Sequence, residues 1–245
     1  MSAPDPGARR AEIADGLQRA RERLDAAARA AGRDPAEIAL LPVTKFFPVS
    51  DVEILYGLGC RAFGESREQE AAAKVSEFRS RTTDPAVAWH MIGRLQRNKA
   101  RAVARWAHTV HSVDSVRLAH ALDAGAQAAQ ESGDRETPVR VLLQVSLDDD
   151  PQRGGVSAAD LPALADEVAA AGGLELRGLM AVPPLGWDPD AAFERLAGLH
   201  SGLRSDHPEA TELSAGMSGD LEAAVRWGST CVRVGTAVLG SRPLA

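Results

Sequence analysis

The feature that most constrains the fold is the regular alternation of short apolar runs with longer helix-forming runs along nearly the whole chain. "PVRVLLQVSL" is apolar at most positions and predicts a buried strand. The next segment, "SAADLPALADEVAAAG", predicts a helix with a serine cap at its start and a glycine at its end. One leading helix and eight strand-plus-helix units fit within the 245 residues. This order predicts a parallel sheet that closes into a (β/α)8 barrel.

The individual elements are placed by the apolar pattern and by glycine and serine at their ends. The leading helix is expected to end at Gly32. Pro42 is awkward within the first expected strand, because proline removes a hydrogen-bond donor from the ladder. Strands are expected over 37–45, 60–64, 86–93, 108–113, 138–147, 174–182, 211–216 and 230–235, and helices over 9–32, 50–58, 66–78, 96–105, 115–130, 157–172, 188–204 and 219–228.

The turn after the first expected strand distinguishes the barrel from an open, doubly wound sheet. A doubly wound sheet predicts a glycine-rich turn at this place. The turn here, "TKFFPVS", contains no glycine, which favours the barrel. No linker or change of composition divides the chain. We therefore expect a flexible N-terminal tail over residues 1–7, followed over 8–245 by a single (β/α)8 TIM-type barrel domain with an extra N-terminal helix.

Charge and cysteine content narrow the class of partner. The formal net charge of -6 and the pI of about 5.6 predict no bulk attraction to nucleic acid or to an anionic membrane. Cys60 and Cys231 lie outside any CxxC pair, which predicts two reduced core thiols. The chain shows no apolar run of membrane-spanning length, and "MSAPDPGARR" lacks the apolar segment of a signal peptide. We expect a monomeric cytoplasmic protein.

Lys45 lies in unusually apolar surroundings, "LLPVTKFFPVS". It ends the first expected strand, and side chains alternate along a strand, so it is expected to share a face with Leu41 and Val43 and to point along the lumen. Active sites of such barrels gather at the C-terminal ends of the strands. An amine in apolar surroundings loses proton affinity and becomes a better nucleophile toward a carbonyl. The alternative is a lysine that extends to solvent at a strand end.

The chain has two other side chains with a primary amine. Lys74, within "EQEAAAKVSEF", is expected on the exposed face of a helix. Lys99, near the start of a basic helix, is expected on a solvated face, with contact to an anion as the alternative. Lys45 is therefore the candidate for amine chemistry.

Residues 213–240 cover the last two expected strands and the turns that follow them. Barrels of this type frequently bind phosphate there, with loop amides and the N-terminus of a short helix. Gly216 and Gly219 permit close approach of the backbone to a ligand. Ser214 and Ser218 offer hydroxyl groups. The segment therefore predicts a phosphate cradle.

The end of the chain adds a second anion-binding element and an inward cation. Gly235 and Thr236 open the last helical turn, whose amides have no acceptor within the helix. The valines on either side of Arg233 would face the outer helices, so Arg233 would face the lumen, where a charge needs a partner. The alternatives are helix capping by Ser218 or Asp220, and an ion pair between Arg233 and an inward carboxylate.

A reactive amine, a phosphate cradle and an inward cation together suggest pyridoxal 5'-phosphate (PLP) as the cofactor. Its aldehyde would join Lys45 as a Schiff base. Its phosphate would rest on the loops after the last two strands, and Arg233 would meet the pyridine nitrogen. Ser214 and Met217 belong to the same candidate set of cofactor-binding residues.

The motifs "LLPVTK", "FGESREQE", "WHMIGRLQRNK", "LRGLMAV", "SAGMSGDLEAAVRWGST" and "VRVGTAVLG" occur in this order. In this set the chain resembles the pyridoxal phosphate homeostasis protein family, the YggS/PROSC-like proteins. The resemblance implies a single barrel similar to the N-terminal domain of alanine racemase, with PLP on the lysine that matches Lys45. It implies phosphate contacts from Ser218, Gly235 and Thr236, and Arg233 beside the ring nitrogen. Family members are thought to buffer or deliver the cofactor, to PLP-dependent apo-enzymes among others, without an established turnover.

Four positions depart from the motifs of that family. Ser66 and Arg67 stand where the family often has Asn and Tyr, so an asparagine contact to the cofactor is not expected here. Arg94 and Arg97 stand where Pro and Ser are usual. These two arginines are expected on a solvated basic surface, with an anionic partner as the alternative.

Two observations argue against efficient racemisation. Alanine racemisation uses a tyrosine as second base, and the one tyrosine of this chain, Tyr56, lies in the helix after the first expected strand. An arginine beside the pyridine nitrogen keeps that nitrogen unprotonated and makes the ring a poorer electron sink. A PLP carrier without efficient turnover is the first hypothesis, with no catalytic residue assigned. A PLP-dependent racemase or lyase of the same fold, and a barrel for another phosphorylated ligand, are the alternatives.

The histidines do not change this choice. His108 and His111 are three residues apart in an expected strand, which would place them on opposite faces and make them poor partners for a metal. His90 lies in a strand near the candidate mouth and is expected to be a core histidine or one that supports the site from behind.

Overall fold

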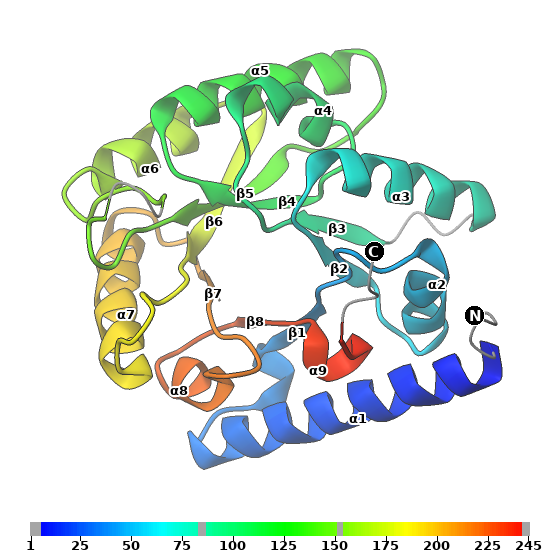
Figure 1. Cartoon of the computed structure of the whole chain (residues 1–245). Helices are drawn as coiled ribbons and strands as arrows, with labels where there is room; N and C mark the ends of the chain where they lie inside the picture. Colours follow the sequence, from blue (N-terminus) through cyan, green and yellow to red (C-terminus); the bar gives the residue numbers. More distant parts are fainter. Residues whose placement is uncertain (1–5, 83–86, 151–153, 242–245) are drawn as a thin grey trace.

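The computed structural model describes residues 6–82, 87–150 and 154–241. In these residues eight strands form one sheet in the order β1-β8-β7-β6-β5-β4-β3-β2, and each hydrogen-bonded pair is parallel. Figure 1 shows the strands at the centre of a ring of helices. The strands are β1 (Ala39–Pro42), β2 (Ala62–Glu65), β3 (Ala88–Met91), β4 (Thr109–Val113), β5 (Val139–Gln144), β6 (Leu174–Met180), β7 (Glu212–Ser214) and β8 (Cys231–Val234).

The predicted (β/α)8 barrel with an extra leading helix is confirmed. The leading helix begins at Pro6, so residues 6 and 7 belong to it rather than to the expected tail, and residues 1–5 lie outside the described residues. The helices are α1 (Pro6–Ala30), α2 (Val49–Gly57), α3 (Glu68–Arg81), α4 (Ala100–Ala104), α5 (Val116–Glu131), α6 (Leu161–Ala170), α7 (Pro189–Asp206), α8 (Leu221–Arg226) and α9 (Thr236–Leu239), with single 3-10 turns at Pro35–Glu37 and Arg97–Lys99.

The seam between β1 and β2 closes the barrel through few contacts. Val43 forms an isolated parallel bridge with Gly64, and the amide of Thr44 donates to the Gly64 carbonyl at 2.9 Å. On the other side, the amide of Val43 donates to Val234 of β8 at 2.9 Å. Donors alternate between the two neighbours of a strand, so the donor that Pro42 lacks would face β2. Proline is tolerated in β1 because it faces this sparse seam.

Helix α1 covers the part of the barrel that the short α9 leaves open. It packs against α2, α8 and α9 and runs beside α9 in Figure 1. Its inner face is apolar and buried, with Ile13, Leu17 and Leu24 at most 4% exposed. A Cβ at Gly16 would lie 2.5 Å from the Val238 carbonyl oxygen of α9. The glycine therefore permits the close approach of the two helices.

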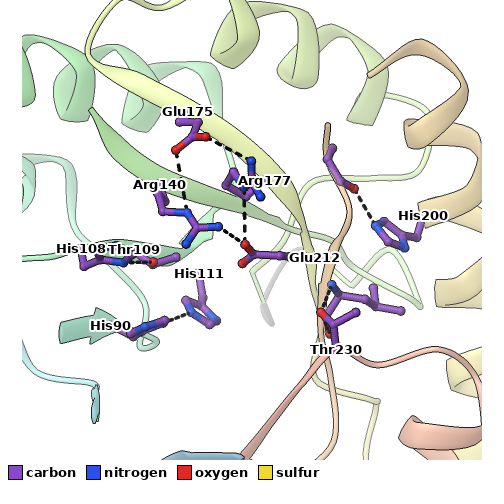
Figure 2. A network of polar contacts seen from close by, with 12 residues as sticks. His90, His108, Thr109, His111, Arg140, Glu175, Arg177, His200, Glu212 and Thr230 are labelled. Atoms are coloured by element: carbon purple, nitrogen blue, oxygen red, sulfur yellow. Dashed lines mark hydrogen bonds and ion pairs between the residues drawn. The ribbon is translucent and has the colours of Figure 1, made fainter. Parts of the chain in front are cut away.

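Charged side chains occupy the N-terminal end of the barrel. Arg140, near the start of β5, donates to Glu212 at the start of β7. The Arg177 Nε atom lies 3.4 Å from Glu212 Oε1, and its Nη1 lies 3.1 Å from Glu175 Oε1 (Figure 2). These charges are paired with one another, as partly buried charges require. Residues at this face of a barrel serve stability, so the site is sought at the opposite end.

Within the described residues, no helix is long and apolar enough to cross a membrane. Cys60 and Cys231 both carry free thiols. Cys60 is buried as predicted, whereas Cys231 is partly exposed.

Candidate functional site

The strand before Lys45 presents its apolar side chains to the barrel lumen. Phe63 of β2 packs against Phe78 of α3, outside the sheet, with ring centroids 6.3 Å apart. Its neighbour Gly64 therefore faces the lumen, because successive side chains point to opposite faces. A Cβ at Gly64 would lie 3.4 Å from Leu41 Cδ2 and 3.4 Å from Val43 Cγ2. Leu41 and Val43 thus line the lumen, as predicted.

Lys45 itself lies in a turn beyond the end of β1. The strand ends at Pro42, so the strand predicted over 37–45 extended too far. Phe46 has a φ of 69°, which turns the chain directly after Lys45. Lys45 is partly exposed, and its Nζ lies 5.9 Å from the centroid of the Phe46 ring. That its amine is directed along the lumen stays a prediction.

Lys74 was predicted on an exposed helix face, and this prediction is wrong. Its side chain is 6% exposed, and its Nζ donates to Glu65 Oε1 at 2.7 Å and to the Thr44 carbonyl at 2.8 Å. The spacing of Lys74 from the buried Ala71 and Phe78, three and four residues away, places it on the inner face of α3. That spacing was visible in the sequence, but the high helix propensity of the surrounding residues pointed to a solvated helix.

The residues at the four unusual motif positions, one serine and three arginines, line one hollow at the C-terminal ends of β2, β3 and β4. Ser66, Arg67, Arg94, Arg97 and Lys99 contribute to the lining of a cavity of about 1160 Å³. Arg94 and Arg97 are exposed, as predicted for a solvated surface. Lys99 is one-third exposed, and its Nζ lies 3.4 Å from a carboxylate oxygen of the first residue of α3. Lys99 therefore contacts a carboxylate of its own chain.

The loop after β7 holds a carboxylate on one of its amides. The amide of Met217 donates to Asp220 Oδ1 at 2.6 Å, and Met217 is 39% exposed. Asp220 precedes α8, but its side chain makes no cap hydrogen bond to that helix. Asp220 therefore occupies the N-cap position of α8, but its carboxylate serves the turn before the helix instead of the helix amides. The single N–H of Met217 is therefore occupied by a carboxylate of its own chain.

The leading helix contributes to this loop, which sequence reasoning missed. Arg23 of α1 donates from Nη1 to the Ser218 carbonyl at 2.6 Å and from Nε to Glu222 at 2.6 Å. A small cavity of about 100 Å³ is lined in part by Arg19, Arg23, Ser218 and Ala237. The arginines lie almost 200 residues before the loop in sequence, so no local pattern connects them.

The last helical turn begins where the sequence predicted. Helix α9 starts at Thr236 with Gly235 before it, so the amides of this first turn have no acceptor within the helix. A Cβ at Gly235 would lie 3.5 Å from the carbonyl oxygen of Val43. The start of α9 therefore lies beside the chain that leads into Lys45, and adjacent strands bring the two segments together.

Arg233 faces the lumen, as predicted, but its partners are not carboxylates. It is 5% exposed, and it donates from Nη1 to Ser214 Oγ at 2.7 Å and from Nη2 to the Ala181 carbonyl at 3.0 Å. His111 Nδ1 lies 2.9 Å from the same Ser214 Oγ. On its other side, His111 Nε2 lies 2.8 Å from His90 Nδ1, a contact that Figure 2 shows. This polar chain crosses the lumen from β3 to β8. Ser214 thus orients Arg233, and its hydroxyl is engaged on both sides.

The two histidines of this polar chain are neutral at neutral pH. Desolvation lowers the pKa of His90 to about 3, and it lowers the pKa of His111 well below 6.5, with a further contribution from the nearby Arg233. His90 lies behind His111 in this chain, and its role in supporting the cofactor site stays a prediction. Among the described residues, no group of three or more His, Cys, Asp or Glu side chains is placed to hold a metal ion.

These histidines predict a loss of stability in mild acid. Each of these histidines has a lower pKa in the folded state than in the unfolded state. Its contribution to stability is therefore complete above about pH 6.5. It is lost as the pH falls from 6.5 toward the folded-state pKa, which is about 3 for His90. Each such histidine lowers the free energy of unfolding by up to about 1.4 kcal/mol per pH unit in this window. Urea unfolding at a series of pH values measures the slope. His111→Asn should reduce the slope, and the exposed His120→Asn is the control that should leave it unchanged.

Comparison with known proteins places this geometry in a family. The model of the alanine racemase N-terminal domain matches residues 16–243. A Mycobacterium tuberculosis protein named pyridoxal phosphate homeostasis protein is 54% identical over 96% of this chain and 95% of its own length. The protein of the same name from Escherichia coli is 38% identical over 94% and 97%.

A solved structure extends the likeness to three dimensions. PipY from Synechococcus elongatus, solved with PLP bound, is 35% identical, has a TM-score of 0.78 and is matched over 93% of this chain and 100% of its own. Identity and coverage of this extent show common descent, and the span that the family model matches includes β1, the loop after β7 and the start of α9. The chain therefore belongs to the alanine racemase N-terminal domain family and, within it, to the pyridoxal phosphate homeostasis proteins.

Proposed function

We propose that this protein binds PLP with Lys45 as the point of covalent attachment and serves the intracellular homeostasis of the cofactor, by buffering or delivering it. The observation that carries the proposal is the position of the Lys45 turn beside the start of α9, where Gly235 approaches Val43. An amine and a set of helix-start amides then lie at the same edge of the barrel. PipY, 35% identical, has PLP bound in its solved structure, which supports the same ligand here.

The residues present fit such a group. When bound, the cofactor supplies an aldehyde that condenses with a primary amine and releases its oxygen as water, and a phosphate dianion. Ser218, Gly235 and Thr236 would hold the phosphate, with hydroxyls and with the amides of the first turn of α9.

Arg233 would determine the protonation state of the nitrogen of a bound pyridine ring. A guanidinium group has donors and no acceptor, so it can approach the ring nitrogen only at the unprotonated lone pair. Ser214 and the Ala181 carbonyl fix two of its nitrogens. An unprotonated ring withdraws electrons weakly, which disfavours chemistry at the amino-acid α-carbon. Arg233 therefore suits a site that holds the cofactor more than one that turns over a substrate.

The position of the one tyrosine agrees with a carrier. Tyr56 packs in the outer layer, with its ring centroid 5.6 Å from that of Phe78 and 4.2 Å from the Arg61 guanidinium carbon. It cannot serve as the second base of a racemase from that place. The proposed role is therefore that of a cytoplasmic, monomeric PLP carrier without efficient turnover, whose acceptors are PLP-dependent apo-enzymes. The net charge of -6 argues against a role on nucleic acid or on an anionic membrane.

Reduction and mapping of the adduct test this function. The purified protein is mixed with PLP, reduced with borohydride and digested, and the modified peptide is identified by mass spectrometry. We expect one modified residue, Lys45, and visible absorbance before reduction. Modification confined to Lys74 or Lys99 contradicts the proposal. Sustained interconversion of D- and L-amino acids by the same sample would instead support the racemase alternative.

A further inference from the structure

A buried ionic cluster lies directly behind the turn that carries Lys45. We call it the Lys74 cluster, and it consists of Thr44, Glu65, Glu70 and Lys74. The Lys74 ammonium donates to Glu65 Oε1 at 2.7 Å, to the Thr44 carbonyl at 2.8 Å and to Glu70 Oε1 at 3.3 Å, so its three donors are all used. Thr44 Oγ1 also donates to Glu65 Oε1, at 2.6 Å. Glu65 and Thr44 are fully buried.

The cluster holds the residues on both sides of Lys45. Thr44 is bound through its hydroxyl to Glu65 and through its carbonyl to Lys74. On the other side, the amide of Phe46 donates to Glu70 Oε1 at 2.5 Å. The backbone on either side of Lys45 is therefore fixed to one pair of carboxylates and one ammonium.

The backbone at Phe46 needs such support. Its φ of 69° is uncommon for a residue with a side chain and costs free energy unless the surroundings impose it. Glu70 holds the amide, and the Arg67 guanidinium carbon lies 4.8 Å from the centroid of the Phe46 ring. Strained residues that the surroundings hold in place cluster at functional sites. The conformation of the turn therefore fixes the direction in which Lys45, the residue before Phe46, leaves the backbone.

The same cluster reinforces the sparse seam of the barrel. The amide of Thr44 donates across the seam to the carbonyl of Gly64, and the next residue, Glu65, accepts the Thr44 hydroxyl. Lys74 then joins both strands to α3. The segment after β1, the end of β2 and the first turns of α3 are therefore bound to one another.

We propose that Lys74, Glu65 and Glu70 are positioning residues for Lys45, which hold the turn so that the Lys45 amine is presented to the bound aldehyde. This inference rests on the proposed attachment of PLP to Lys45. None of the three needs to touch the cofactor, because they act through the backbone of Thr44 and Phe46. A fixed turn raises the rate of covalent attachment, because the amine need not search for its orientation.

Glu70 offers the cleanest test, because its side chain is 28% exposed. When Glu70 is replaced, the buried Lys74 ammonium still has Glu65 as its ion-pair partner. Glu70→Ala removes the acceptor for the Phe46 amide. Glu77→Ala, on the same helix and in an exposed ion pair with Arg81, is the matched control. Glu70→Gln keeps a side-chain oxygen that can accept from the Phe46 amide.

Measurements with two ligands distinguish a loss of Lys45 positioning from a general disruption of the binding site. The rate of covalent attachment is measured with PLP, and noncovalent affinity is measured with pyridoxine 5'-phosphate, which has no aldehyde. In Glu70→Ala we expect attachment to slow by about tenfold, with the affinity for pyridoxine 5'-phosphate within about twofold of wild type. Glu70→Gln should recover most of the rate, and Glu77→Ala should match wild type. In the ligand-free protein, hydrogen exchange at the Phe46 amide should be faster in Glu70→Ala only.

Other results would contradict either the positioning role or the proposed function. An unchanged attachment rate in Glu70→Ala, or unchanged exchange at Phe46, overturns the positioning role. Equal losses of attachment rate and of pyridoxine 5'-phosphate affinity show a general structural role and overturn it as well. If the wild-type adduct maps to a residue other than Lys45, the proposed function fails before the variants are compared.

Discussion

Replacing Lys45 with alanine is expected to abolish covalent capture of PLP by the protein. The amine is the only atom of the site proposed to form a bond to the aldehyde, whereas the phosphate would be held by the loop after β7 and the start of α9. Noncovalent affinity for pyridoxine 5'-phosphate should therefore change little. The side chain is partly exposed, so the free energy of unfolding should change by less than about 1 kcal/mol.

The measurement is the yield of borohydride-fixed adduct, read by intact mass, together with the visible spectrum. Lys45→Arg is the informative companion, because it keeps a positive charge at the turn and removes the nucleophile. Lys99→Ala is the control, since Lys99 is one-third exposed and pairs with Glu68. An adduct yield in Lys45→Ala equal to that of wild type would refute the assignment of this lysine.

Replacing Lys74 with methionine is expected to destabilise the fold by about 3–5 kcal/mol at neutral pH, the cost typical of breaking a buried ion pair from one side. Among the described residues, Glu65 would be left as a carboxyl group with no exposed surface and no cation beside it, and only Thr44 Oγ1 would still donate to it. Its second oxygen, Oε2, is already buried without a hydrogen-bond partner in the described structure. Within the described contacts, the cluster therefore has no spare donor to replace the ammonium.

The pH dependence of this deficit has a definite sign. Burial raises the pKa of Glu65 above 4.5, and Lys74 opposes that rise, so the variant raises the pKa further. A carboxyl group with a raised folded-state pKa favours the fold below 4.5 and penalises it as the pH rises through the folded pKa. The deficit of Lys74→Met should therefore be largest at neutral pH and shrink as the pH approaches 4.5.

Denaturant unfolding of wild type and variant across this pH range measures the deficit. Adding Glu65→Gln to Lys74→Met should recover a large part of the stability, because the buried charge is removed and an acceptor for Thr44 remains. Lys99→Met, which removes a longer contact of 3.4 Å made by a side chain that is one-third exposed, should cost less than Lys74→Met. A deficit of Lys74→Met as small as that of Lys99→Met would contradict the role of Lys74 as the buried centre of its cluster.

The sequence by itself determined the architecture and the faces to which the strand side chains point, although it placed the end of β1 three residues too late. Alternating strand and helix patterns are repeated along the chain, and each pattern depends on local spacing that the chain carries wherever it folds. Side-chain alternation was enough to direct Leu41, Val43 and Arg233 inward, and the structure confirms all three. The start of the last helical turn at Thr236 followed from Gly235 in the same local way.

Only the tertiary structure decided which side chains meet. Lys74 looked like a solvated helix residue, and its burial depends on Thr44, which follows β1, and on Glu65, which ends β2. The chain from Arg233 through Ser214 to His111 connects three strands across the lumen, and Arg23 reaches Ser218 from a helix at the other end of the sequence. A local pattern fixes the face on which a residue lies. The partner on that face depends on which distant segment the closed barrel brings there, because the energy of a buried charge is set by its neighbours in space.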